Sequence, residues 1–169
     1  FQMVKLFDEI KIECIPSGLE LVCNRPDIPQ DQGNLAVKAA KILQTKFPGR
    51  CKGARIHLNK KIPHGAGLGG GSGNAAGVLL GLNFLWGLNL NRKDLVLIAS
   101  ELGSDVPFFL LSPCAIGRGR GEVLESVENA IRFYILIAYP GFAVSTALVY
   151  GNLKLKLTKR ENNISILKN

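Results

Sequence analysis

A glycine-rich stretch near the middle of the chain reads Lys60-Lys61-Ile62-Pro63-His64-Gly65-Ala66-Gly67-Leu68-Gly69-Gly70-Gly71-Ser72-Gly73-Asn74-Ala75-Ala76. Six of the nine residues from Gly65 to Gly73 are glycine. Inside a helix or strand each glycine is less favourable than alanine by roughly 0.5–1 kcal/mol, because glycine loses more backbone entropy on folding. The stretch is therefore predicted to be a loop whose backbone can approach a ligand closely.

A helix is expected to follow this loop. The apolar residues after it recur at helical spacing: Ala75, Val78, Leu79, Leu82, Leu85 and Trp86. This periodicity predicts a helix that begins near residues 72–74. A helix N-terminus offers unpaired N–H groups and the positive end of the helix dipole, and both suit phosphate oxygens. With Lys60 and Lys61 just upstream, the pattern predicts a phosphate site for a nucleotide. The alternative is a flexible surface loop capped by Ser72.

Spacing tests three known kinds of phosphate-binding glycine loop. A P-loop requires a lysine directly after the last glycine, and none is present. Gly65, Gly67 and Gly70 satisfy the dinucleotide pattern Gly-x-Gly-x-x-Gly, but no acidic residue follows before Asp94 to bind a ribose. The His-Arg-Asp and Asp-Phe-Gly signatures of protein kinases are absent from the sequence.

The whole string from Pro63 to Ala76 resembles the ATP-binding motif of the galactokinase, homoserine kinase, mevalonate kinase and phosphomevalonate kinase superfamily. Within it, Gly-Gly-Gly-Ser-x-Asn-Ala-Ala is similar to the 4-diphosphocytidyl-2-C-methyl-D-erythritol kinase family of the non-mevalonate isoprenoid pathway. Gly73 stands where that family usually has a second serine. The resemblance implies an α+β fold of the ribosomal protein S5 domain 2 type, with a mixed sheet packed against helices and the glycine loop before a central helix.

The same resemblance implies ATP and Mg²⁺ as cofactors. The residues carried over to ATP binding are Pro63, Gly65, Gly67, Leu68, Gly69, Gly70, Gly71, Ser72, Gly73 and Asn74, and those from Gly65 to Ser72 are expected to surround the phosphates. Asn34 and Lys60 match positions that approach the adenine–ribose end of ATP. Ser72 is expected to help hold the Mg²⁺ ion.

Asp105 lies in Leu102-Gly103-Ser104-Asp105-Val106-Pro107-Phe108-Phe109. From local sequence alone it is a helix cap or turn former, although an acid flanked by apolar residues also suits the floor of a cleft. The string resembles Leu-Gly-Ala-Asp-Val-Pro-Phe-Phe of the same family, whose Asp is the catalytic base. The resemblance implies that Asp105 accepts the proton of the substrate hydroxyl.

The segment Tyr139-Pro140-Gly141-Phe142-Ala143-Val144-Ser145-Thr146 resembles the family's Pro-Gly-x-x-x-x-Thr segment. The resemblance places Thr146 at the substrate and Tyr150 against the cytosine ring, where an aromatic face suits stacking. A partly buried core position is the alternative for Tyr150. The implied activity is ATP-dependent phosphorylation of the 2-hydroxyl of 4-diphosphocytidyl-2-C-methyl-D-erythritol. The alternatives are a sibling kinase of the homoserine or mevalonate type, a non-catalytic basic domain that binds RNA, or a folded but inert kinase fragment.

Composition indicates a globular domain with an anionic partner. The 169 residues carry a net charge of +8, which fits either a phosphorylated small molecule or a nucleic acid. The basic residues are dispersed and aromatics make up only 7% of the chain, which favours the small molecule. No apolar run reaches the roughly 20 residues of a membrane span. We expect no nucleic acid or membrane partner, a monomer or weak homodimer, and a cytoplasmic (or, in a plant or alga, plastid) location.

Element signals give an α+β order. Extended segments over residues 3–15 and 19–23 flank a Pro-Ser-Gly turn and predict a hairpin. Asn34 and Asn91 are predicted N-caps of two helices, and the alternation of Ala54, Ile56 and Leu58 predicts a strand that leads into the glycine loop. Later strands are expected near residues 115, 123–124 and 132–138.

Domain organisation follows from the resemblance. The family's opening motifs Ala-Lys-Ile-Asn-Leu and Gly-Tyr-His do not occur here. The chain is therefore expected to be a fragment: residues 1–153 form the N-terminal ATP-binding kinase domain, truncated at its start, and residues 154–169 form a linker toward a missing C-terminal domain.

Overall fold

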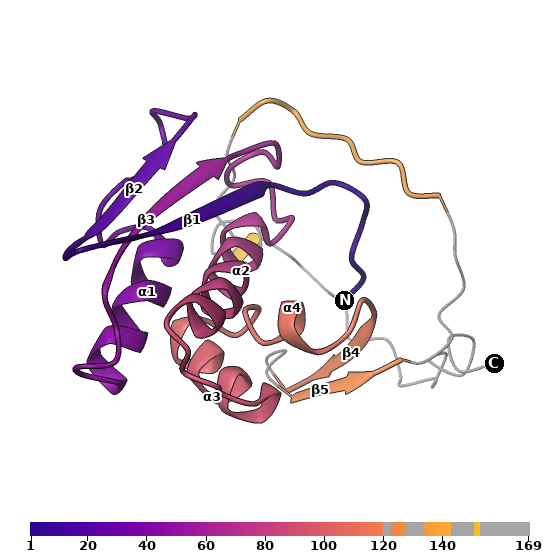
Figure 1. Ribbon diagram of the computed structural model, residues 1–169. Coiled ribbons are helices and arrows are strands. Elements are labelled where there is room, and N and C mark those ends of the chain that lie inside the picture. Colours follow the sequence, from indigo (N-terminus) through magenta and orange to yellow (C-terminus); the bar gives the residue numbers. More distant parts are fainter. Residues whose placement is uncertain (120–122, 128–133, 143–150, 153–169) are drawn as a thin grey trace.

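The structure is a computed structural model that describes residues 1–119, 123–127, 134–142 and 151–152 (Figure 1). The α+β class predicted from the sequence is confirmed. The elements follow the order β1 (Glu9–Ile15), β2 (Leu19–Cys23), α1 (Leu35–Lys46), β3 (Gly53–Asn59), α2 (Gly70–Leu85), α3 (Arg92–Leu102), α4 (Phe108–Leu111), β4 (Ala115–Arg118) and β5 (Val123–Ser126).

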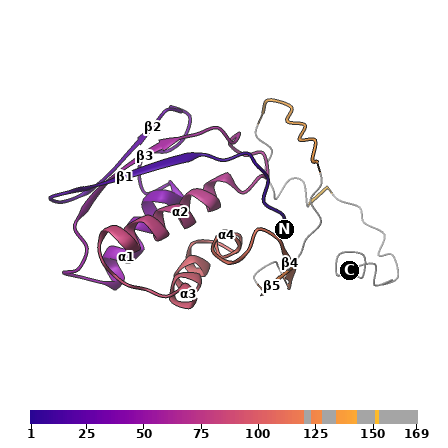
Figure 2. The same ribbon diagram turned by 45° about the vertical axis from the view of Figure 1, so that its right-hand side comes forward.

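A three-stranded mixed sheet forms the outer layer of the fold. Its strand order is β1-β3-β2, with β1 antiparallel and β2 parallel to β3. Figures 1 and 2 show α1 and α2 beneath one face of this sheet, and α3 and α4 on the side of α2 away from the strands. The core lies between these layers and includes the fully buried Leu43, Ile56, Val78, Leu79 and Leu82.

The hairpin predicted for β1 and β2 is wrong, because β3 lies between these two strands. Residues 54, 56 and 58 of β3 are all buried, and in the central position β3 has a neighbouring strand along each of its two edges. The connection from β1 to β2 crosses the first residue of β3 directly: a Cβ atom on Gly53 would lie 2.4 Å from the carbonyl carbon of Ser17. The Ala54 amide donates to the Gly18 carbonyl at 3.0 Å across the same crossing.

The predicted helix caps are confirmed for α1 and α3. The Asn34 side chain accepts a hydrogen bond from the Ala36 amide, and Asn91 forms a reciprocal capping box with Asp94. The helix after the glycine loop begins at Gly70, earlier than the predicted start at residues 72–74. Its N-cap is Gly69, whose left-handed backbone (φ 68°) turns the chain into the helix.

The end of the chain departs from the sequence prediction. A strand was expected over residues 132–138, but residues 134–138 form no strand, and residues 132–133 lie outside the described residues. Thr146, Tyr150 and the expected linker 154–169 also lie outside them. Among the helices that the structure describes, none has the length and apolarity needed to cross a membrane.

Candidate functional site

The glycine loop joins the end of β3 to the start of α2. Gly65, Gly67 and Gly69 have φ angles of 68°, 71° and 68°, so every second residue of this turn has a left-handed backbone. At Gly69 any other L-residue would add about 1–2 kcal/mol of strain at the point where the helix starts. The positions of glycine in the sequence thus set the path of the loop.

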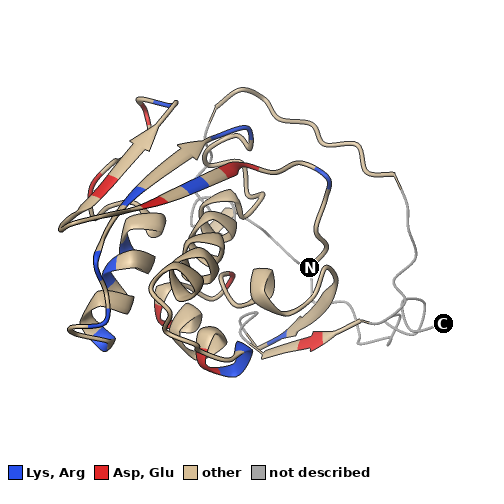
Figure 3. Ribbon diagram, viewed as in Figure 1, with Lys and Arg blue, Asp and Glu red and all other residues tan. Residues whose placement is uncertain are grey.

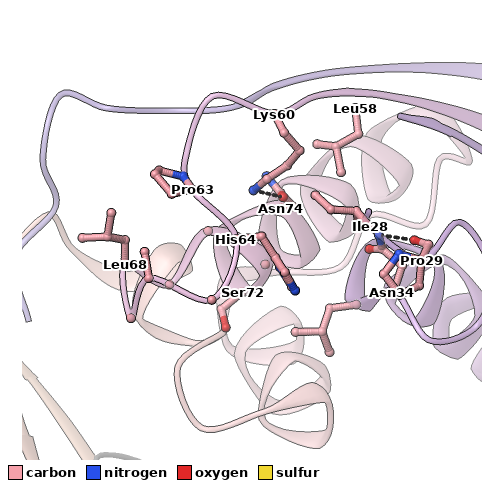
Figure 4. Close-up of a pocket in the computed structure, with 17 residues that line it drawn as sticks. Ile28, Pro29, Asn34, Leu58, Lys60, Pro63, His64, Leu68, Ser72 and Asn74 are labelled. Carbon is pink, nitrogen blue, oxygen red and sulfur yellow. Dashed lines mark hydrogen bonds between the residues drawn. The ribbon is translucent and has the colours of Figure 1, made fainter. Parts of the chain in front are cut away.

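The loop closes over a cavity of about 420 Å³ (Figure 4). The lining residues are Ile28, Pro29, Asn34, Leu35, Leu58, Lys60, Pro63, His64, Gly65, Ala66, Gly67, Leu68, Gly69, Gly70, Gly71, Ser72 and Asn74. Every residue predicted to bind ATP is in this set except Gly73. Gly73 instead packs against the ring of Phe109, where a Cβ atom would come within 3.3 Å of the ring.

The two walls of the cavity differ in chemistry. On one side, no side chain among the described residues caps α2, and its first turn contains no acidic residue, so its N–H groups and the positive end of its dipole are open to an anion. On the other side, Ile28, Pro29, Leu35 and Leu58 form an apolar surface. An anion-binding wall facing an apolar wall suits a nucleotide, which has phosphates at one end and a flat base at the other.

Of the two lysines before the loop, only Lys60 lines the cavity. Its ammonium group pairs with Asp8 and donates to Asn74 Oδ1 at 3.1 Å. Lys61 is not among the lining residues and pairs with Glu9 at 2.8 Å, with side chains 47% and 56% exposed. Of the two lysines predicted to lie beside a phosphate site, the structure therefore places only Lys60 at the cavity.

Asp8 is a member of the site that sequence analysis missed. Its side chain is 1% exposed, and it accepts hydrogen bonds from the Lys60 ammonium, the Asn74 amide and the backbone N–H groups of Lys61 and Ile62. Burial alone would raise the pKa of this carboxyl, but these hydrogen bonds outweigh burial and hold the pKa below its usual value. Nothing in the local sequence distinguishes Asp8 from the exposed Glu9 beside it.

Asn34 lines the cavity, but its side-chain amide is already engaged. Its Oδ1 accepts from the Ala36 amide at 2.9 Å and its Nδ2 donates to the Pro29 carbonyl at 2.8 Å. Figure 4 shows this side chain turned toward Pro29 at the apolar wall. Asn34 therefore shapes that wall, and its contact with adenine stays a prediction.

Asp105 lies in the turn after α3, is exposed, and is not among the lining residues. The segment that carries it nevertheless reaches the glycine loop, because Phe109 packs against both Gly69 and Gly73. The structure thus brings the Asp105 segment beneath the start of α2. The role of Asp105 as a base stays a prediction.

His64 was not assigned to the site from the sequence, yet it lines the cavity, and its carbonyl accepts a hydrogen bond from the Tyr139 hydroxyl at 3.5 Å. The apolar lining residues were missed for a different reason. A leucine such as Leu58 in a strand pattern is expected in the core whether or not one side of it faces a cavity.

The cavity offers one side chain, that of Ser72, as a protein ligand for a Mg²⁺ ion bound together with a nucleotide. Ser72 lines the cavity in the first turn of α2, and Mg²⁺ bound with a nucleotide usually takes most of its ligands from phosphate and water. In the described part of the chain, no group of three or more His, Cys, Asp or Glu side chains is placed to hold a metal ion. The assignment of Ser72 to Mg²⁺ stays a prediction.

Comparison with known proteins confirms the resemblance read from the glycine loop. Residues 34–113 match the family described as GHMP kinases N terminal domain. The chain is 45% identical over 156 residues to a 4-diphosphocytidyl-2-C-methyl-D-erythritol kinase of Chloroherpeton thalassium, covering 91% of this chain and 54% of that protein. It is 42% identical over 160 residues to a protein of the same name from Acaryochloris marina, covering 94% and 51%.

A solved structure agrees with these relatives. The crystal structure of a 4-(cytidine 5'-diphospho)-2C-methyl-D-erythritol kinase matches with a TM-score of 0.65 at 38% sequence identity, covering 85% of this chain and 50% of that one. The chain spans about half the length of the curated relatives it matches.

Proposed function

Because residues 34–113 match the family of GHMP kinase N-terminal domains, we propose that the chain supplies the ATP-binding part of a small-molecule kinase. The proposed reaction is ATP-dependent phosphorylation of the 2-hydroxyl of 4-diphosphocytidyl-2-C-methyl-D-erythritol, a step of non-mevalonate isoprenoid biosynthesis. The observation that carries the proposal is the cavity in which the glycine loop and the uncapped start of α2 face an apolar wall.

In this proposal the ATP phosphates lie against the backbone of residues 65–72 and the first turn of α2. The free N–H groups there bind phosphate oxygens without any rearrangement of side chains. Lys60 Nζ lies beside Gly70, the first residue of α2, so its positive charge is proposed to act at this phosphate end of the cavity rather than at the adenine–ribose end that the resemblance implies. The base lies against the apolar wall formed by Ile28, Leu35 and Leu58.

The proposed chemical step is a phosphoryl transfer with Asp105 as base. The substrate hydroxyl oxygen attacks the γ-phosphorus of ATP, its proton passes to the Asp105 carboxylate, and the bond from the γ-phosphorus to the bridging oxygen of ADP breaks. Mg²⁺ bound with ATP would neutralise charge on the phosphate oxygens, and Ser72 is the residue proposed to contact it. Thr146 and Tyr150 are proposed to line the substrate site.

A small-molecule partner agrees better with the surface than RNA does. On the outer face of the sheet the basic side chains are paired with acids: Lys11 with Glu13, Arg55 with Glu20, and Lys61 with Glu9. Figure 3 shows basic and acidic residues interspersed along these strands. We propose that the protein acts in the cytoplasm or a plastid as a monomer or weak homodimer, with residues 1–153 as the nucleotide-binding domain and residues 154–169 as a linker.

Calorimetric titration of the 169-residue chain tests this function. The chain should bind the Mg²⁺ complex of a non-hydrolysable ATP analogue, and Lys60→Met should weaken binding by roughly tenfold or more, because a hydrogen bond from a charged group contributes about 1.5–3 kcal/mol. Lys61→Met is the matched control, since Lys61 does not line the cavity and its side chain is paired with the exposed Glu9; it should change the Kd by less than about twofold.

The second titration uses cytidine diphosphate and separates the alternatives. Binding of both nucleotides supports the proposed substrate. Binding of the ATP analogue alone favours a sibling kinase, and salt-sensitive binding of RNA without either nucleotide supports the RNA-binding alternative. If the chain binds no ATP analogue, the proposed function is wrong.

A further inference from the structure

Lys60 occupies a position that is unfavourable for a positive charge by itself. Its side chain is only 6% exposed, and its Nζ lies beside the first residue of α2: a Cβ atom on Gly70 would be 3.0 Å from it. The N-terminal end of a helix carries the positive end of the dipole. A buried ammonium group there requires a nearby negative charge.

Asp8 supplies that charge, and the sheet places it. The antiparallel ladder between β1 and β3 pairs Glu9 with Asn59, so Asp8, one residue before the ladder, meets Lys60, one residue after it. The Oδ2 atom of Asp8 accepts from the Lys60 ammonium and from Asn74 Nδ2 at 2.9 Å. Its Oδ1 atom accepts from the backbone N–H groups of Lys61 and Ile62 at 2.7 and 2.8 Å.

The hydrogen bonds of Lys60 leave one donor for a ligand. An ammonium group has three N–H donors, and in the described part of the chain two have partners, Asp8 and the Asn74 side chain at 3.1 Å. Lys60 and Asn74 both line the cavity, and Figure 4 shows them meeting at its edge. The third donor is therefore available to a molecule that fills the cavity.

We propose that Asp8 is a positioning residue for nucleotide binding: it fixes Lys60, together with the backbone of residues 60–62 at the entrance to the glycine loop, so that the remaining Lys60 donor faces the nucleotide. This inference rests on the proposed function, because it assumes that a nucleotide occupies the cavity. Asp8 does not line the cavity and acts through Lys60.

A purely electrostatic role and a positioning role predict opposite results. If Asp8 only neutralised Lys60, its removal would leave an extra positive charge near an anionic ligand and would tighten binding. If Asp8 holds Lys60 in place, Asp8→Asn weakens binding, because the amide can turn an N–H donor toward the ammonium group and displace it. The direction of the change in Kd therefore separates the two roles.

The test is a double-mutant cycle on the 169-residue chain, with the Mg²⁺ complex of adenylyl imidodiphosphate as the probe. Asp8→Asn should raise the Kd by about tenfold or more when Lys60 is present, and by less than about twofold in the Lys60→Met background. Glu9→Gln is the matched control, since Glu9 is the neighbouring carboxylate in an exposed lysine pair; it should leave the Kd unchanged. Thermal unfolding of each variant shows which variants are folded at the titration temperature.

Three results would overturn the inference: an unchanged Kd, a lower Kd, or an equal loss of affinity in both Lys60 backgrounds, which would indicate a merely structural role. If Asp8→Asn does not fold, Asp8→Glu takes its place, because it keeps the negative charge but displaces the carboxylate from Lys60 by one methylene group. A positioning role predicts a loss of affinity that disappears in the Lys60→Met background, and an unchanged Kd or a loss that persists there would overturn the inference. Failure of the unsubstituted chain to bind the probe refutes the proposed function itself.

Discussion

Substitution of Gly53 tests the insertion of β3 between β1 and β2. A Cβ atom at this position would lie 2.4 Å from the carbonyl carbon, 2.6 Å from the oxygen and 2.7 Å from the Cα of Ser17. Non-bonded carbon atoms pack best at about 3.5–4.0 Å, so the crossing chain in Gly53→Ala would have to move by about 1 Å. The atoms that clash are backbone atoms and cannot rotate away as a side chain can.

The expected loss of stability is about 2–4 kcal/mol. Forcing extra volume into a packed site costs about 1–3 kcal/mol. The shift also weakens the hydrogen bond from the Ala54 amide to the Gly18 carbonyl, which contributes about 0.5–1.5 kcal/mol. At an unstrained glycine with free space, alanine would instead stabilise the fold by about 0.4–1 kcal/mol through the unfolded state. The sign of the change therefore reports on the crossing.

The assay is urea unfolding followed by the fluorescence of Trp86, the single tryptophan of the chain, which is 8% exposed. Gly49→Ala is the control, because Gly49 has a left-handed backbone (φ 78°) but no atom of the described residues within 4 Å of an added Cβ. Its expected loss is about 1–2 kcal/mol, smaller than that of Gly53→Ala. An unchanged or increased free energy of unfolding for Gly53→Ala would refute the crossing argument.

Three further predictions concern charge, capping and the proposed base. The pKa of the Asp8 carboxyl lies below its ordinary value of 3.8, so as the pH falls below about 4 this group is protonated in the unfolded chain before it is protonated in the folded chain, and the free energy of unfolding should fall as the pH drops through the folded pKa. Urea unfolding of Asp8→Asn should show a weaker dependence of this free energy on pH, and equal dependences in the two proteins would contradict the prediction. Asn91→Ala should lower the free energy of unfolding by about 1 kcal/mol by removing a cap, whereas Ser72→Ala should change it by less than about 0.5 kcal/mol because α2 has no side-chain cap. Asp105→Asn should leave the Kd for the Mg²⁺ complex of the ATP analogue within about twofold, because Asp105 does not line the cavity, and calorimetry showing a tenfold change would contradict its placement.

Local signals in the sequence predicted the elements, but not how the strands pair. The alternation of Ala54, Ile56 and Leu58 identified β3, and Asn34 and Asn91 marked two helix starts. The short turn between β1 and β2 favours a hairpin on local grounds. The insertion of β3 depends on contacts between residues far apart in the chain, and Gly53, which permits it, looks locally like an ordinary loop glycine.

The candidate site likewise has one part that could be predicted from the sequence and another part that could not. The ligand-facing backbone could be predicted, because glycine spacing directly reflects the left-handed positions that the loop uses. The wall formed by Ile28 and Leu58 could not, since an apolar residue beside a cavity and one in the core have the same sequence pattern. Asp8 could not be predicted either, because its burial comes from its partner Lys60 across the sheet and not from its own neighbours.

The β1–β3 ladder connects the stability of the fold to the proposed nucleotide site. One end pairs Ile15 with Gly53, beneath the crossing, and the other pairs Glu9 with Asn59, beside Asp8 and Lys60. A slip by one residue would turn every side chain of the strand to the opposite face and separate the buried ion pair. Gly53→Ala should therefore weaken binding of the ATP analogue in titrations of the folded variant, although Gly53 is at the far end of the ladder from the cavity. Unchanged affinity in a clearly destabilised Gly53→Ala would mean that Asp8 and Lys60 hold their geometry without support from the crossing.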